Sequence, residues 1–479
     1  MNDLAGARHA DARGGPRWRT RALVLAVLLA VPWGVTGLVW KREHDRASVQ
    51  ERIALAHGLA LHAAELRDTA PAMARNLGLA AVEIHSDEQT RAGLIDTLVG
   101  MHSDVLSPDA SGEVVLSDDG RIALAGGDEL GVWDLTTWLE PKIVDKADRI
   151  AVLKDRREGL SMTALSGDGR TVLTGGGVGD TVVWDLTDPA KPIRVAALVG
   201  GKNAEDANSV RAMALSRDGR TAAIADLGGD LIMWNLTDRS HPARLSVAKL
   251  RSSSVVRDLR LSADGGIAVI SYDGLFNNGA VAIWDLSDPS RPVKSADLGL
   301  PAGKYARATV MDADGHVILV GNAHRAEIWN LDDRSHPVRT AALDVPFTDL
   351  YGMAVTSDGK TALLAGPSDS AILWNLSDPY KPARLAALKG YTREINSVAL
   401  GADGEVALAA GPGGTYLWDL RGLAEVVADP ERAACRDNPG TEISKADWAR
   451  YTGGADWSDY KGEDLSDALA VCAIRRGSL

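Results

Sequence analysis

The chain has 479 residues, a formal net charge of −13 and two cysteines. Two cysteines are too few for a disulfide-rich scaffold or a four-cysteine zinc module, and the excess of acidic residues argues against a nucleic-acid binder, which would carry a basic face. Charged residues at 24% and apolar residues at 45% are close to the values of globular proteins, so the chain is not disordered overall.

The first predicted element is a membrane anchor. Residues 22–40 (ALVLAVLLAVPWGVTGLVW) contain no charged side chain, and a helix of this length spans about 28 Å, near the thickness of a bilayer core. A cleaved signal peptide is the alternative, but it requires a shorter apolar region and a small-x-small cleavage site. Here the apolar stretch continues to Trp40 and is followed by Lys41 and Arg42. We therefore expect an uncleaved transmembrane helix.

The charges around this helix predict its orientation. Five arginines precede it and four basic residues follow it closely, which favours a cytoplasmic N-terminus. Residues 1–21 would then be a basic cytoplasmic tail, and the rest of a single-pass protein would lie outside the cytoplasm. Residues 1–42 hold seven basic and two acidic side chains, a net +5 out of the total of −13, so the remainder carries −18. That remainder has no attraction to anionic lipid and would depend on the anchor.

Residues 41–99 are predicted to form a helical stalk. Apolar residues between 53 and 66 recur at helical spacing. Pro71 suits the first turn of a second helix. Ser86 and Gln89 match a capping box that opens a third helix.

An internal repeat covers the centre of the chain and accounts for many of its 13 Trp, which stand beside only 2 Phe. The triplet Trp-[Asp/Asn]-Leu recurs at intervals of 44–51 residues, and an Asp-Gly pair stands 14–20 residues before each Trp. In six repeats a proline follows the Leu by six positions. Three markers in a fixed order indicate a repeat architecture. The repeat tryptophans are Trp133, Trp184, Trp234, Trp284, Trp329, Trp374 and Trp418.

Each repeat is predicted to contain four strands. In the third repeat, residues 213–216 and 221–225 flank an Asp-Gly pair that suits a tight hairpin. Residues 231–236 and 243–248 are two further strands, separated by a polar loop that ends in proline. Four strands in each of seven repeats predict a mainly β fold, a closed seven-bladed β-propeller over residues 100–427.

These repeats resemble the WD40 family over about 325 residues. The Trp-Asp strand end and the Asp-Gly hairpin carry the resemblance, and residues 184–192 (WDLTDPAKP) resemble repeats of bacterial WD40 proteins, although other bacterial propellers use a similar phrase. The family's Gly-His dipeptide is missing, and Tyr391 stands where the His would be. We therefore expect the family's polar network of His, Asp, Ser/Thr and Trp to be incomplete, and the blades to depend more on apolar packing.

The helical segment after the span resembles the linker of bacterial STAND-type signalling proteins with C-terminal WD40 repeats. Those proteins carry an N-terminal NTPase, whereas this chain begins just before the span. The resemblance therefore implies the membrane span, linker and propeller half without the NTPase.

The seventh repeat lacks a fourth strand of its own, and we expect a segment near Val99 to Leu106 to supply it. Residues 428–479 are predicted to be a helical tail that holds Cys435 and Cys472. Its Cys…Asp-Trp-Ala-Arg-Tyr arrangement resembles the C-terminal element of the same bacterial WD40 group. A tail outside the cell favours a disulfide between the two cysteines, and a tail inside the cell favours two buried thiols.

The sequence contains no recognisable catalytic, cofactor or metal motif. A Walker pattern is missing, and the glycine-rich residues 175–179 and the calcium-loop fragment 312–315 both occupy turns between strands. We therefore expect no catalytic residue, no cofactor, no metal and no nucleic-acid partner. The main prediction is a membrane-anchored scaffold or sensor that binds a protein or peptide. The alternatives are an enzyme, a hydrolase or lyase with its site in the central channel, and a sensor of a small ligand or the cell wall.

The candidate binding surface is formed by the loops that enter the inner strands. Tyr and Arg side chains are the ones that most often anchor protein interfaces. The candidate partner-binding residues are Asn208, Arg211, Arg257, Lys304, Tyr305, Arg307, Tyr351, Tyr391 and Arg393.

Overall fold

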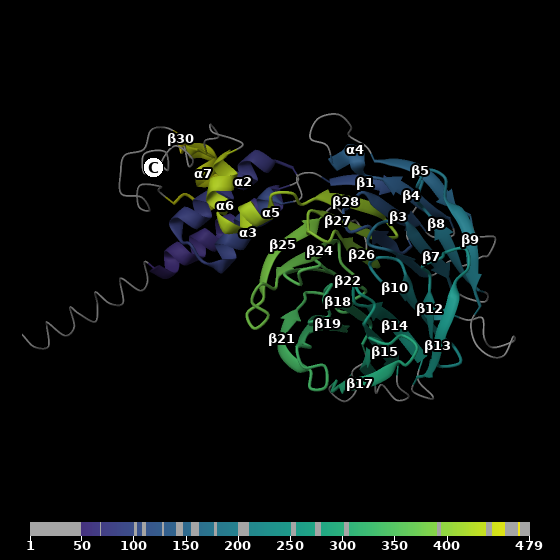
Figure 1. The fold of residues 1–479 in the computed structure, drawn as a ribbon. Coiled ribbons are helices and arrows are strands. Elements are labelled where there is room, and N and C mark those ends of the chain that lie inside the picture. The colour runs from purple at the N-terminus through teal and green to yellow at the C-terminus, as the bar shows by residue number, and fades with distance from the viewer. Residues whose placement is uncertain are drawn as a thin grey trace, which may run out of the picture.

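The protein folds into a β-propeller with a group of helices beside it (Figure 1). The described residues form seven four-stranded antiparallel sheets, so the predicted seven-bladed propeller is confirmed. The computed structural model describes residues 49–67, 69–99, 103–107, 112–126, 129–139, 147–154, 162–176, 180–199, 210–250, 255–273, 279–300, 306–389, 394–436, 443–455 and 468–469.

Six blades are built from four consecutive strands each. Blade 1 contains β2 (Val114–Leu116), β3 (Ile122–Gly126), β4 (Leu130–Asp134) and β5 (Asp148–Leu153). Blade 2 contains β6 (Met162–Leu165), β7 (Thr171–Gly175), β8 (Thr181–Asp185) and β9 (Ile193–Leu198). Blade 3 contains β10 (Val210–Leu215), β11 (Thr221–Asp226), β12 (Asp230–Asn235) and β13 (Ala243–Lys249). Blade 4 contains β14 (Val255–Leu261), β15 (Ile267–Asp273), β16 (Ala280–Asp285) and β17 (Val293–Leu298). Blade 5 contains β18 (Ala308–Met311), β19 (Val317–Asn322), β20 (Arg325–Asn330) and β21 (Val338–Asp344). Blade 6 contains β22 (Gly352–Val355), β23 (Thr361–Ala365), β24 (Ser370–Asn375) and β25 (Ala383–Lys389).

The seventh blade combines both ends of the propeller sequence. It contains β26 (Ser397–Leu400), β27 (Val406–Gly411) and β28 (Gly414–Asp419), and its fourth strand is β1 (Ser103–Ser107) from before blade 1. β1 runs antiparallel to β28, with Val105 opposite Tyr416. This strand exchange confirms the predicted closure of the ring, and it removes an open sheet edge.

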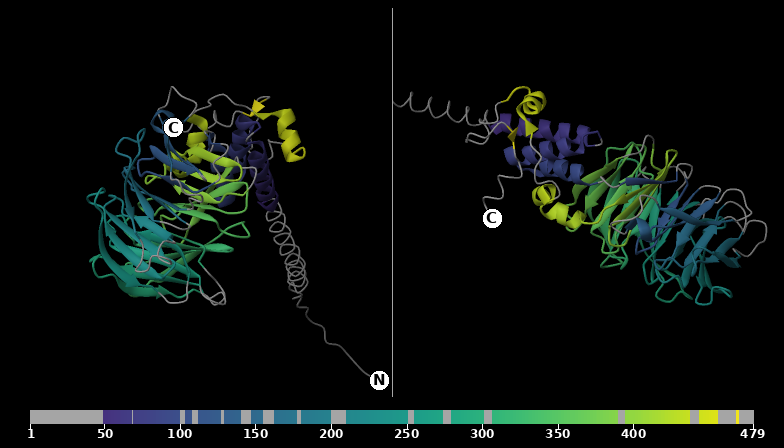
Figure 2. Two further views of the ribbon diagram at one scale, coloured as in Figure 1. Left: turned by 90° about the vertical axis from the view of Figure 1, so that its right-hand side faces the viewer. Right: turned by 90° about the horizontal axis from the view of Figure 1, so that it is seen from above.

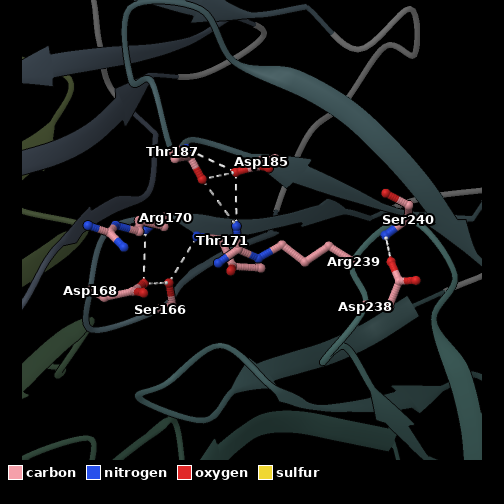
Figure 3. Close-up of polar contacts among 9 residues, drawn as sticks. All are labelled: Ser166, Asp168, Arg170, Thr171, Asp185, Thr187, Asp238, Arg239 and Ser240. Carbon is pink, nitrogen blue, oxygen red and sulfur yellow. Dashed lines mark hydrogen bonds and ion pairs between the residues drawn. The ribbon is translucent and has the colours of Figure 1, made fainter.

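The Asp-Gly marker of each repeat builds the turn between the first two strands. In blade 2, the Ser166 hydroxyl donates to Asp168 Oδ1 at 2.6 Å and accepts from the N–H of Thr171 at 2.9 Å (Figure 3). Gly169 completes the turn with φ of 70°, in the left-handed region that favours glycine. The hairpin is thus specified by a short Ser-x-Asp-Gly segment, and this explains why the marker predicts the strands.

In blade 2, the Asp of the Trp-Asp-Leu triplet turns the chain out of the third strand and links this blade to the next one. Asp185 Oδ1 accepts from the N–H of Thr187 at 2.9 Å and from its hydroxyl at 2.6 Å (Figure 3). Arg239, in the loop that precedes the outer strand of blade 3, donates to the same oxygen at 2.9 Å. One carboxylate therefore stabilises its own turn and ties blade 2 to blade 3.

A closed ring of backbone hydrogen bonds joins the hairpin turns of all seven blades. In each turn, the residue two positions before the glycine donates its N–H to the C=O of the equivalent residue in the next blade, at 2.8–3.1 Å. The side chains at these positions differ, so the backbone alone makes the ring. Its members, in order, are Asp118, Gly167, Arg217, Ala263, Ala313, Ser357 and Ala402, which donates back to Asp118.

The repeat tryptophans pack between neighbouring blades. Trp184, for example, lies in one apolar cluster with Leu124 of blade 1 and Val172 of blade 2. Its indole N–H donates to Thr174 Oγ1 at 2.9 Å. Five others have a buried indole nitrogen without a hydrogen-bond partner among the described residues, so the family's polar network is incomplete, as expected. The five are Trp133, Trp234, Trp284, Trp329 and Trp374.

This difference between blades makes a testable prediction. Replacing Thr174 by Val should lower the free energy of unfolding by about 1–2 kcal/mol, because the Trp184 N–H would then be buried without a partner. Val320 occupies the corresponding position on β19, two residues after the one opposite Trp329. Val320→Thr should raise the stability by about 1 kcal/mol by supplying the missing acceptor. Urea denaturation measures both changes, and shifts of the same sign would contradict the explanation.

All described helices except one come from the two ends of the described chain, and they lie together beside blade 6 (Figures 1 and 2). We call them the helical module. Leu59 and Leu77 from the predicted stalk share one buried cluster with Ala434 and Trp448 from the predicted tail. The two segments are thus one packed unit. Its helices are the one over residues 49–66, α2 (Pro71–Ile84), α3 (Glu88–Leu98), α5 (Leu423–Ala428), α6 (Pro430–Arg436) and α7 (Lys445–Thr452). It also contains a two-stranded sheet, in which β29 (Ile443–Ser444) pairs with β30 (Ala468–Leu469). The helix α4 (Thr136–Leu139) belongs to blade 1 instead.

The start of α3 differs from the prediction by one residue. The N-cap is Asp87, not Ser86, and its carboxylate accepts from the N–H of Thr90 at 2.9 Å. The Thr90 hydroxyl in turn accepts from the N–H of Asp87 at 3.0 Å. The capping box therefore forms, with Asp87 and Thr90 in place of Ser86 and Gln89, because a carboxylate is a good acceptor for the helix N–H groups.

The helical module also covers the outer edge of blade 6. Arg67 Nη1 donates to the C=O of Ala387 at 2.8 Å, and the N–H of Ala387 donates to Asp96 Oδ1 at 2.5 Å. Ala387 lies on β25, which pairs only with β24 in its sheet. The module thus satisfies edge groups that would otherwise be open to another strand.

Two predictions depend on residues outside the described part. The transmembrane segment 22–40 lies there, and none of the described helices is long and apolar enough to cross a bilayer. Cys435 is disulfide-bonded, while Cys472 lies outside the described residues, so its pairing stays a prediction.

Candidate functional site

The first strands of the seven blades line a central channel of about 660 Å³. Residues that stand the same number of positions before the hairpin glycine of their repeat are equivalent in the seven first strands. Each such set of equivalent residues forms one layer across the channel. The eighth position before the glycine lies at the mouth, and the fourth lies nearest the hairpin turns. These layers are used below to describe the site.

Three arginines from adjacent blades occupy the mouth. Arg211, Arg257 and Arg307 each stand eight positions before the glycine in blades 3, 4 and 5, and all three are exposed. Tyr351 and Asn396 hold the same position in blades 6 and 7 and are also exposed. The mouth is therefore basic on one side and polar on the other.

The structure thus brings together four of the nine residues predicted to bind a partner. Arg211, Arg257 and Tyr351 line the channel itself. Arg307 and Tyr351 line a smaller hollow beside it, and Arg307 Nη2 lies 2.9 Å from Asp349 Oδ2. The other five lie outside the described residues: Asn208, Lys304, Tyr305, Tyr391 and Arg393.

Below the mouth, the channel holds a charged group that the sequence analysis missed. Arg260 stands five positions before its glycine, where the other six blades have only Val or Ala. Its Nε lies 3.2 Å from Asp258 Oδ1 and donates to the C=O of Thr309 at 3.1 Å. The side chain is 47% exposed because it faces the channel. Aligning the repeats on the hairpin glycine would have revealed this exception.

Glu113 is the second group that was missed. It stands seven positions before its glycine in blade 1, is half-buried, and accepts from the N–H of Thr163 at 2.7 Å. Burial raises the pKa of this carboxyl to about 7, and the positive charge of Arg260 limits the rise. At neutral pH the Glu113 side chain is therefore divided between its neutral and charged forms.

The far end of the channel is apolar. Seven half-buried side chains, one from each blade, form the last layer before the hairpin turns. The channel therefore changes from basic at the mouth, through one Arg with two acids, to apolar at its floor. The floor residues are Leu116, Leu165, Leu215, Leu261, Met311, Val355 and Leu400.

The charged residues of the channel can recognise a ligand. The described lining of the channel contains no His or Cys, and no group of three metal-ligating side chains was found in the described part of the chain. The channel contains the guanidinium of Arg260 and the carboxyl of Glu113, whose protonation state changes near neutral pH. Both groups can recognise a charged or polar group of a ligand.

Comparisons with known proteins agree on the fold. No family model matches the chain. The β-propeller domain of Cps50 (Swd1) from Myceliophteria thermophila superposes with a TM-score of 0.51 and 14% identity, covering 66% of this chain and 99% of that one. A chain of the mitotic checkpoint complex gives 0.52 and 14%, covering 67% and 92%. At this identity both structures show the fold alone.

One curated protein is similar in sequence over a short stretch. The NAD(+) hydrolase ApTIR of Actinoplanes sp. (strain ATCC 31044 / CBS 674.73 / SE50/110) is 36% identical over 146 residues. The match covers 30% of this chain and only 14% of that protein. The chain thus spans a small part of this relative's length.

Proposed function

We propose that this protein is a membrane-anchored WD40-type propeller that binds a protein or peptide partner by docking an acidic segment at the channel mouth. The observation that carries the proposal is the row of exposed arginines, Arg211, Arg257 and Arg307, on three adjacent blades. Residues after position 42 carry a net charge of −18, so a basic patch is unusual on this surface. A local basic patch on an acidic protein attracts acidic groups and steers them to one place.

The side chains at the mouth are suited to such a partner. A guanidinium forms two parallel hydrogen bonds with one carboxylate, so a row of arginines can hold a row of acidic side chains. Tyr351 is 37% exposed beside them and offers an aromatic surface, which is common at the centre of interfaces. Together they favour an acidic peptide segment with at least one apolar residue.

The experiment compares two triple variants at opposite ends of the ring. Arg211→Ala, Arg257→Ala and Arg307→Ala together should raise the Kd for a Glu-rich peptide by about tenfold or more, because three charge-assisted contacts are lost. Binding is measured by fluorescence anisotropy at two salt concentrations. The matched control removes the same charge from three exposed arginines that follow the hairpin glycines, at positions 121, 170 and 220. Equal loss in both variants would count against the mouth.

The anchor and its orientation remain part of the proposal. The apolar segment 22–40 and the disulfide bond of Cys435 support a propeller outside the cytoplasm, since disulfides persist in oxidising compartments. The likeness to bacterial STAND-type linkers supports a signalling role. A C-terminal tag that resists external protease on intact cells would contradict this orientation.

An enzyme is the second candidate, and Glu113 is the observation that favours it. A carboxyl with a pKa near 7 inside a channel has the property required of a general acid or base. The hydroxyl groups nearest to it belong to Thr163 and Ser397, whereas the three exposed arginines at the mouth favour binding. The activity in the name of the NAD(+) hydrolase is not carried over, because only 14% of that protein is matched.

A further inference from the structure

We propose that the throat of the channel, between the mouth and the apolar floor, is a binding site for a single carboxylate group held by Arg260. This site lies below the docking surface proposed above. The carboxylate belongs either to a free small acid or to an acidic side chain of a docked partner. In the second case the inference rests on the proposed function and deepens it.

The first argument is the position of Arg260. The corresponding residues of the other six blades are small and apolar. A long charged side chain in that layer is therefore a local exception to the repeat. Its guanidinium is also the only positive charge among the described residues five to seven positions before the hairpin glycines, between mouth and floor.

The second argument is how Arg260 is oriented. Asp258 Oδ2 accepts from both the N–H and the hydroxyl of Thr309, at 2.8 and 2.9 Å, and Asp258 Oδ1 accepts from the N–H of Leu259 at 2.9 Å. This fixed carboxylate and the Thr309 C=O hold the Nε side of Arg260. The two Nη atoms have no hydrogen-bond partner among the described residues. They form the edge with which a guanidinium binds a carboxylate in two parallel hydrogen bonds.

The third argument is the size and polarity of the space. The whole channel, of which the throat is the middle part, encloses about 660 Å³, which lies within the range of small-ligand pockets, and such pockets combine an apolar surface with a few polar groups. Leu261 and Met311 belong to the apolar floor, one layer beyond Arg260. A monocarboxylate with a short apolar part matches both layers. A polyanion does not, since Asp258 and Glu113 would repel it.

Glu113 makes the site sensitive to pH. The charged groups that act on it are Arg260 and Asp258, and Arg211, Arg257 and Tyr351 line the same channel nearer the mouth. Below about pH 7 the neutral carboxyl can donate a hydrogen bond to a bound carboxylate, and above it the charged form repels the ligand. Affinity should therefore increase as the pH falls through 7.

The test measures the binding of 4-methylpentanoate and of its amide to the full-length purified protein by isothermal titration calorimetry. We expect the acid to bind and the amide to bind about tenfold more weakly, because only the acid uses the guanidinium. Arg260→Gln should weaken binding of the acid by about tenfold or more, and Arg260→Lys should restore part of it. Glu113→Gln should bind the acid with an affinity that no longer changes between pH 6 and 8. A melting curve of each variant controls for folding.

A second arm identifies the source of the carboxylate. A Glu-rich peptide and its Gln-containing analogue are tested on the same variants. If only the peptide depends on Arg260, the site takes a partner's side chain, and if the free acid does, it takes a small ligand. Alanine at Arg211, Arg257 and Arg307 should weaken the peptide but not the free acid, which separates this inference from the docking surface. No dependence on Arg260 for either probe, or no binding of either, overturns the proposal.

Discussion

Deleting residues 103–107 should lower the melting temperature of the propeller by about 10 °C or more. The deletion removes β1, the outer strand of blade 7, and with it the pairing to β28. Leu106 is 5% exposed and packs against blade 7 and blade 1, which contributes about 1.5–3 kcal/mol. Four ladder pairs with their hydrogen bonds add several more. For a domain of this size each kcal/mol corresponds to about 2 °C.

A pair of point variants separates the loss of packing from the shortening of the chain. Leu106→Asp places a charge in the buried cluster, and Val105→Asp places the same charge on a side chain that is 38% exposed. Differential scanning calorimetry should show a large decrease for the first and a small one for the second. The open edge of β28 should also make the deletion variant aggregate. A deletion variant that melts like the wild type would mean that blade 7 is stable with three strands.

Replacing Arg67 by Ala should release the helical module from blade 6 and cost about 3 kcal/mol. Arg67 is 5% exposed and donates to the C=O of Ala387. Its charge also opposes the rise in pKa that burial imposes on Asp96. Without Arg67, a buried C=O loses its donor and a carboxyl loses a positive neighbour, and removing one partner of such a group costs several kcal/mol.

The measurement combines urea denaturation with hydrogen exchange of the peptide that contains β25. Exchange at Ala387 should become faster in Arg67→Ala. The control is Arg436→Ala, because Arg436 and Glu425 lie 2.7 Å apart with side chains that are 57% and 70% exposed, so its loss should cost less than about 1 kcal/mol. Asp96→Asn should be milder than Arg67→Ala, since the amide oxygen still accepts from the Ala387 N–H. Similar costs for Arg67→Ala and Arg436→Ala would show that the module is not held by this contact.

Much of the propeller could be predicted because each blade carries its own local signals. The predicted strands 221–225 and 243–248 are β11 and β13, which end one residue later. The Ser-x-Asp-Gly turn and the Asp or Asn after each Trp fix these boundaries through hydrogen bonds within a few residues. The missing fourth strand of the last repeat also pointed to β1. Such signals need no knowledge of distant contacts.

The helical module could not be predicted in the same way. Leu77 and Trp448 share a core although more than 300 residues separate them, and nothing in either segment specifies the other. The capping of α3 was shifted by one residue because Ser86 and Asp87 are both good N-cap residues. The structure has Asp87 at the cap, and His57 Nε2 from the preceding helix lies 2.7 Å from Asp87 Oδ2, a contact between distant residues.

The residues at the mouth of the channel were predicted from the sequence, whereas the charged residues inside the channel were not. Arg211, Arg257 and Tyr351 attracted attention because they follow loops and are of types common at interfaces. Arg260 lies inside β14, where alternation along a strand makes a charged residue look like an ordinary solvent-facing one. Only the closed ring turns that face toward a narrow channel.

The ring of hydrogen bonds between the hairpin turns has a consequence for the timing of ligand exchange. Its seven hydrogen bonds form a closed circle around the floor end of the channel. That end therefore cannot widen unless several of these bonds lengthen together. A molecule at Arg260 would therefore enter and leave by the mouth. A partner seated on Arg211 and Arg257 would trap it, and the small molecule would dissociate no faster than the partner does. The two ligands would therefore dissociate in a fixed order: the partner at the mouth first, and the small molecule at Arg260 second.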